Sequence, residues 1–166
     1  QGSVLADPIF KEISEVFPEI TPIDRTSTHA WSHPDVRAAV DATGRRKLVM
    51  AGIATEVCLV QSVLGAIKDG FDVYFVSDCS AGINKEAHDD AKVRMTMAGA
   101  KPINWVAVLN EWAPDYTTPE RVVLTSVLAQ RGDTAGLLTD YALAQVTAGI
   151  VAVPDFRAAP AQVGEH

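Results

Sequence analysis

The chain has 166 residues, of which 48% are hydrophobic and 21% charged, a composition typical of one globular domain with its own core. Fourteen basic and twenty-one acidic side chains give a net charge of −7, which disfavours nucleic acid as a partner because phosphate binding requires a basic face. No apolar run approaches the ~20 residues that a membrane span requires. Two cysteines make no disulfide framework, so we expect a cytoplasmic protein. From the charge and the short apolar runs we expect neither a nucleic-acid nor a membrane partner.

The first part of the chain predicts two helices, a short strand and a polar loop. Residues 8–16 have helical apolar spacing, and residues 19–23 are expected to form an edge strand because Pro22 cannot donate to an inner ladder. A second helix is expected to begin at Pro34 and to end at Gly44. The polar loop before this helix carries three side chains with functional potential: Arg25, His29 and Trp31.

The segment 47–65 predicts a buried strand, a turn and a helix. Residues 48–51 form the apolar run, Gly52 opens the turn, and Thr55 is the natural cap of a helix that has Cys58 in its first turn. The first N–H groups of a helix have no intrahelical partner and carry partial positive charge. Both features favour the thiolate, which is the nucleophile, and the same N–H groups can hold a developing oxyanion. The alternative is an inert core cysteine, since a free cysteine is among the most buried residue types.

A second unit follows the same plan. We expect strands over 71–78 and 103–109 and helices over 86–98 and 119–130. Alternation of strands and helices at this spacing predicts crossover connections and a parallel sheet, so the fold class is α/β. In such sheets ligands bind beyond the carboxyl ends of the strands, where we expect Arg25, Cys58 and Asp78 to gather. His88 is expected to lie on a solvated helix face.

Residues 47–82, KLVMAGIATEVCLVQSVLGAIKDGFDVYFVSDCSAG, resemble the isochorismatase-like cysteine hydrolases, and most closely their YcaC-like branch. That family has a strand, a Gly-x-x-Thr-x-x-Cys turn, a helix, and a strand that ends in a Ser/Thr-Asp turn. The residues of this chain that match the pattern are Gly52, Thr55, Cys58 and Asp78. The similarity extends more weakly from Gly2 to about Trp112.

The resemblance implies a three-layer α/β/α, Rossmann-like parallel sheet and a Cys–Lys–Asp triad that cleaves a small amide, ester or related C–N or C–O bond. Cys58 carries over as the nucleophile, and Arg25 stands in the lysine position, where it would act as a fixed positive charge. The turn residues Gly52, Ala54 and Thr55 would serve the oxyanion, with a cis peptide expected at Ala54–Thr55. The branch implies no cofactor and no metal, a small-molecule substrate and a homo-oligomer.

One departure from the family pattern bears on activity. The family's aspartate ends a first strand well before the equivalent of Gly2, so we expect a single domain over 1–149 without its first two strands, followed by an arm over 150–166. A truncated chain, a part not represented in this sequence, or pairing with another chain would each explain the departure. His29 and Trp31 are candidates to line the substrate pocket, or are simply packed in their loop.

Two alternatives to a hydrolase stay open at this point. The chain would be a catalytically degenerate binding or structural member if it keeps the cysteine without the acid. It would be a thiol-redox protein if Cys58 and Cys79, which follow consecutive predicted strands, lie close enough to form a disulfide.

Overall fold

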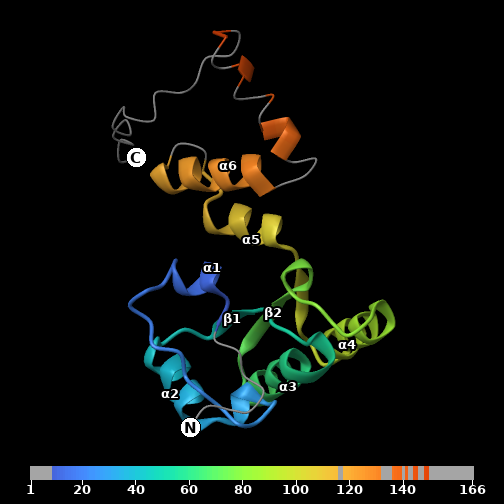
Figure 1. Cartoon of the computed structure of the whole chain (residues 1–166). Helices are drawn as coiled ribbons and strands as arrows, with labels where there is room; N and C mark the ends of the chain where they lie inside the picture. Colours follow the sequence, from blue (N-terminus) through green and yellow to red (C-terminus); the bar gives the residue numbers. More distant parts are fainter. Residues whose placement is uncertain are drawn as a thin grey trace, which may run out of the picture. The chain divides into compact units, whose positions relative to one another are not determined.

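The computed structural model describes residues 9–115, 118–131, 136–139, 141, 144–145 and 148–149 (Figure 1). The chain divides after Asn104 into two compact units, and each is described by itself. The prediction of one domain over 1–149 stays a prediction, and the expected arm over 150–166 lies outside the described residues. Within the described residues, no helix is long and apolar enough to cross a membrane.

The first unit begins with an exposed segment that contains the short helix α1 (Lys11–Ser14). The strand predicted over 19–23 is wrong: these residues form no ladder and are exposed. Pro22 has no N–H to donate, and no described strand lies beside this segment to supply a partner ladder. A short 3-10 turn, η1 (Ala30–Ser32), leads to α2 (Pro34–Ala42), which ends, as predicted, before Gly44 with a φ of +66°.

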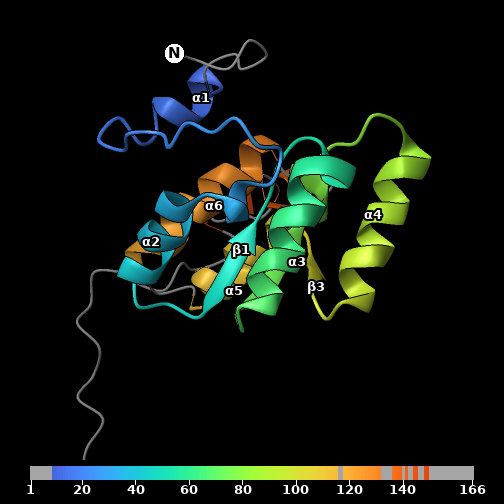
Figure 2. The same ribbon diagram turned by 90° about the horizontal axis from the view of Figure 1, so that it is seen from below.

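Three parallel strands form the sheet of this unit, in the order β1-β2-β3. They are β1 (Lys47–Met50), β2 (Asp72–Val76) and β3 (Lys101–Ile103). Between β1 and β2 the chain forms a π-helical turn, η2 (Thr55–Leu59), and α3 (Val60–Lys68). Between β2 and β3 it forms the 3-10 turn η3 (Ser77–Cys79) and α4 (Lys85–Met97), and α3 and α4 lie side by side (Figures 1 and 2). The predicted α/β fold with a parallel sheet is confirmed.

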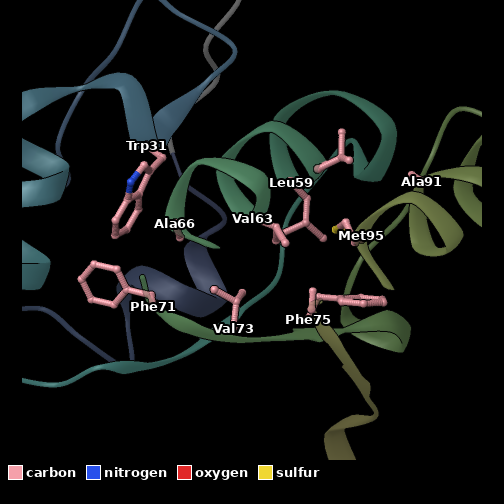
Figure 3. Packing of buried hydrophobic residues seen from close by; sticks show 11 residues of the cluster. Trp31, Leu59, Val63, Ala66, Phe71, Val73, Phe75, Ala91 and Met95 are labelled. Atoms are coloured by element: carbon pink, nitrogen blue, oxygen red, sulfur yellow. The ribbon is translucent and has the colours of Figure 1, made fainter. Parts of the chain in front are cut away.

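The core of the first unit lies between α3, α4 and one face of β2 (Figure 3). Val63 and Ala66 of α3 pack toward Val73 and Phe75 of β2, and all four side chains are at most 1% exposed. Full burial of one such valine or phenylalanine stabilises the fold by about 1.5–3 kcal/mol. The helix that follows Cys58 is therefore fixed against the centre of the sheet.

The second unit corrects one prediction. Residues 103–109 were expected to form a strand, but the strand ends at Ile103 and the helix α5 (Trp105–Trp112) follows. The apolar residues Trp105, Val108, Leu109 and Trp112 recur at helical spacing, a pattern that a reading of the run as a strand overlooks. The predicted helix at 119–130 is confirmed as α6 (Pro119–Arg131).

Candidate active site

Cys58 lies in the turn η2, shortly after the carboxyl end of β1, as a half-buried free thiol. Its N–H donates to the carbonyl oxygen of Ala54 at 3.0 Å, and the N–H groups of Val57 and Leu59 share that acceptor at 3.1 and 3.3 Å. Two expectations therefore need correction. Ala54, not Thr55, precedes the first helical residue, and the amide of Cys58 is not free because the helix begins three residues earlier than this cysteine.

Two other amides of the predicted oxyanion turn are also engaged. Gly52 N–H donates to Ser80 Oγ at 3.3 Å, and Thr55 N–H donates to the Ala81 carbonyl at 2.9 Å. Ile53, the residue before Ala54, pairs with Ala81 in an isolated parallel bridge. The cis peptide lies between Ile53 and Ala54, one bond earlier than expected.

Arg25 lies in the loop before η1 and is half-exposed. Its guanidinium donates to the carbonyl of Ser27, and its backbone N–H donates to Asp24 Oδ1 at 2.8 Å. In the described part of the chain, no hydrogen bond or ion pair joins its guanidinium to Cys58 or to a carboxylate. Arg25 was expected to follow a strand of the sheet. It does not, because residues 19–23 form no strand.

His29 and Trp31 hold the same loop against α3. His29 Nε2 lies 2.8 Å from the Gln61 carbonyl oxygen, and the indole N–H of Trp31 donates to Asp69 Oδ2 at 2.8 Å. The Trp31 ring is 4% exposed and meets Phe71 edge-on, with ring centroids 5.1 Å apart. These are packing contacts, and the substrate-pocket role of the two residues stays a prediction.

Cys79 is the second free thiol and lies exposed in η3, after β2. Partial burial and the negative charge of Asp78 raise the pKa of the Cys79 thiol. At neutral pH this shift disfavours the thiolate, so Cys79 is the poorer candidate for a nucleophile.

Sequence reasoning missed two residues beside the cysteine turn, Glu56 and His88. His88 Nδ1 lies 2.9 Å from Thr55 Oγ1, and Glu56 Oε1 accepts the Ile83 N–H at 2.8 Å. The expectation that His88 lies on a solvated face is therefore wrong. Its spacing from two core residues on α4, Ala91 and Met95, places it on the inner face of that helix, and this signal was present in the sequence.

His88 is one of the residues that line an open pocket of about 290 Å³. Its lining comes from the loop after β2 and the start of α4: Ser80, Ala81, Gly82, Asn84, Lys85 and His88. Among the described residues, no group of three His, Cys, Asp or Glu side chains is arranged to hold a metal ion. The loops after β1 and β2 meet where Ile53 pairs with Ala81, but neither Cys58 nor Asp78 is among the residues that line this pocket, and their predicted gathering stays a prediction.

Known proteins match both the sequence and this architecture. Residues 8–106 match the Isochorismatase domain family. The probable hydrolase YcaC of Escherichia coli is 34% identical over 135 residues, which are 81% of this chain and 65% of that protein. This chain therefore spans less than two thirds of the length of that relative.

Two solved structures are similar at the same level of identity, 34%. YcaC from Pseudomonas aeruginosa, with hexane-2,5-diol and covalent acrylamide, superposes with a TM-score of 0.74 over 81% of this chain and 66% of that one. The Escherichia coli YcaC structure, described as an octameric hydrolase of unknown specificity, gives a TM-score of 0.74 over 82% of this chain and 67% of that one. With the family match over residues 8–106, these likenesses show that the chain belongs to the Isochorismatase domain family and resembles its YcaC hydrolases.

Proposed function

We propose that this chain carries the nucleophile of a cysteine hydrolase that cleaves a small amide, ester or related C–N or C–O bond. The observation that supports this most strongly is the position of Cys58, a free, half-exposed thiol at the start of a helical segment just beyond the carboxyl end of β1. Ligands of parallel α/β sheets bind at this edge. The family match adds that related proteins are hydrolases.

The proposed reaction has two halves. The Cys58 thiolate attacks the carbonyl carbon, the carbon–sulfur bond forms, and the carbonyl electron pair moves onto oxygen. Collapse of this intermediate expels the amine or alcohol, which takes up a proton, and leaves a thioester. Water then attacks the thioester, which releases the acid and a proton and restores the thiolate.

Two groups of the chain have proposed roles in this scheme. The N–H of Ala54, in the turn before Cys58, is proposed to donate to the oxyanion, whereas the Cys58 N–H is already bonded to the Ala54 carbonyl. Arg25 cannot give up its proton, so its role is that of a fixed positive charge near the reacting groups, after its side chain turns from the Ser27 carbonyl. The proton carrier would be the aspartate of the family pattern.

The Pseudomonas aeruginosa relative supports the choice of a nucleophilic reaction. Acrylamide forms a covalent bond with a protein through attack by a nucleophile on its terminal carbon, and that relative carries covalent acrylamide. At 34% identity and a TM-score of 0.74, we expect the same kind of reactivity here.

We also propose a homo-oligomer in the cytoplasm. The oligomer is proposed because the Escherichia coli relative is described as octameric and residues 9–23 of this chain expose many apolar side chains.

The test is turnover of a panel of small amides and esters, with an acid quench during the reaction. We expect an acyl group on the peptide that contains Cys58, loss of turnover in Cys58→Ser, and retained turnover in Cys79→Ser. Equal turnover in Cys58→Ser and the parent protein would exclude Cys58 as the nucleophile.

A degenerate binding protein is the second candidate, because no described carboxylate forms a hydrogen bond or ion pair with Cys58 or with the Arg25 guanidinium. This candidate predicts binding of the panel compounds without turnover and without an acyl adduct. A redox role instead predicts a disulfide between Cys58 and Cys79 after mild oxidation, while both are free thiols in this structure.

A further inference from the structure

The turn that precedes Cys58 is bound at several points to the loop that follows β2. Ile53 pairs with Ala81 in an isolated parallel bridge, and the Thr55 N–H donates to the Ala81 carbonyl at 2.9 Å. These are backbone contacts that many sequences can make. They bring the two loops together but leave the orientation of the next residues to side chains.

Glu56 supplies a side-chain contact between the two loops, in addition to the bond from the Gly52 N–H to Ser80 Oγ. Its Oε1 accepts the Ile83 N–H at 2.8 Å, and its Oε2 is buried without a partner among the described residues. The hydrogen bond from Ile83, the Glu56 N–H and the charge of His88 lower the pKa of this carboxyl against the opposing effect of burial. A Cβ on Gly82 would lie 2.6 Å from Oε2 and 2.9 Å from Cβ of His88, so a larger residue at this position would displace one of these groups.

His88 supplies another side-chain contact, from a different element. Its Nδ1 lies 2.9 Å from the hydroxyl of Thr55, a residue with no exposed surface. His88 is held in place because α4 is capped by Asn84, whose Oδ1 accepts the Ala87 N–H at 2.9 Å. The helix is also anchored in the core by Met95, which is 0% exposed.

We propose that Glu56 and His88 are positioning residues, which hold the Cys58 turn in its reactive geometry by fixing Thr55 and Glu56 to α4 and to the loop after β2. We call the group Thr55, Glu56, Ala81, Ile83 and His88 the clamp. The catalytic meaning of the clamp depends on the proposed role of Cys58. Cys58 follows Glu56 by two residues, and its amide bonds to Ala54 just before the clamp, so a shift of the clamped residues moves the sulfur.

The experiment measures the rate of alkylation by acrylamide at Cys58 in the full chain with Cys79→Ser, across a range of pH, folded and in urea. The test variants are His88→Ala, Thr55→Val and Glu56→Ala. Thr55→Ser keeps the hydroxyl and serves as the rescue variant. Glu86→Ala is the matched control, because Glu86 is an exposed glutamate in the first turn of α4 outside the clamp. Hydrogen exchange of the Thr55 and Ile83 amides is followed in each variant.

We expect Cys58 to be alkylated faster in the folded parent than in the unfolded chain. In each test variant the alkylation rate should fall at least about fivefold, and its pH profile should become more similar to that of the unfolded chain. Fivefold corresponds to about 1 kcal/mol at 25 °C. Thr55→Ser and Glu86→Ala should keep the parent rate, and faster exchange at Thr55 or Ile83 should accompany the losses. Test variants that keep both the parent rate and the parent exchange would overturn the clamp and leave the role of Cys58 intact.

Two remaining outcomes bear on the role of Cys58 and on the clamp. A folded parent no faster than the unfolded chain would contradict the role of Cys58. The exchange data alone would then decide whether the clamp exists: faster exchange in the variants supports it, and unchanged exchange overturns it. If His88→Ala fails to fold, the comparison of Thr55→Val with Thr55→Ser decides, since these variants differ from threonine only in a hydroxyl or a methyl group.

Discussion

Gly65 is the position in α3 where one added methyl group has the most direct consequence. A Cβ at this position would lie 2.8 Å from Cδ1 of Trp31 and 3.1 Å from Cε1 of His29. The indole ring has little room to move, because its N–H is bonded to Asp69 and the ring packs edge-on with Phe71. In Gly65→Ala, the loop that carries His29 and Trp31 must therefore shift away from α3.

Two opposing terms set the size of the effect. Replacing glycine by alanine in a helix interior stabilises by about 1 kcal/mol. Forcing an extra group into a packed core costs about 1–3 kcal/mol, and a contact below 3.0 Å with a fixed ring belongs to the upper part of that range. We therefore expect Gly65→Ala to lower the free energy of unfolding by roughly 1–2 kcal/mol, the difference between these terms.

The assay is urea unfolding followed by circular dichroism, with Ala38→Gly as the matched control. Ala38 is exposed in the middle of α2, so its replacement measures the helix-propensity term with the opposite sign. Subtracting that term isolates the cost of overpacking at Gly65. A Gly65→Ala protein more stable than the parent by the full propensity gain would show that Trp31 and His29 do not lie against this helix.

Two further predictions concern charged groups. Hydrogen bonds from Lys85 and Lys92 lower the pKa of Asp89 to about 2, below the value of about 3.9 for an unfolded chain. The stability that Asp89 contributes is therefore full above about pH 4 and is lost as the pH falls toward 2. Thermal unfolding in Asp89→Asn should depend less steeply on pH in that window, and an unchanged slope would refute the pairing. Asp78→Asn should raise the alkylation rate of Cys79 at pH 7, because it removes one cause of the raised pKa of that thiol; an unchanged rate would refute the influence of Asp78.

Local patterns predicted the strand–turn–helix around the cysteine well. The apolar run at 48–51 became β1 (Lys47–Met50), and the helical spacing after it became η2 and α3. These elements are specified by near neighbours in the sequence, through apolar periodicity and the glycine turn. The fold class followed from the same alternation of strands and helices.

The contacts around the turn could not be predicted, because they depend on residues far apart in the sequence. Thr55 was expected to cap a helix, but its hydroxyl lies against His88, 33 residues later. The segment 103–109 was assigned as a strand on its apolar content, whereas the spacing from Trp105 to Trp112 favours the helix that forms. The N–H of Thr55 was expected to be free, but it donates to the Ala81 carbonyl, an acceptor that emerges only when the two loops meet. The N–H of Cys58 instead donates to the Ala54 carbonyl within its own turn.

The central claim is that the fold activates Cys58 as a nucleophile. Its most direct test is the rate of acrylamide alkylation at Cys58, mapped by peptide mass spectrometry at pH 7 in the folded protein and in urea, with Cys79 as the internal comparison. The account predicts that Cys58 reacts faster in the folded protein than in urea and faster than Cys79. A Cys58 that reacts more slowly when folded, or no faster than Cys79, would contradict it.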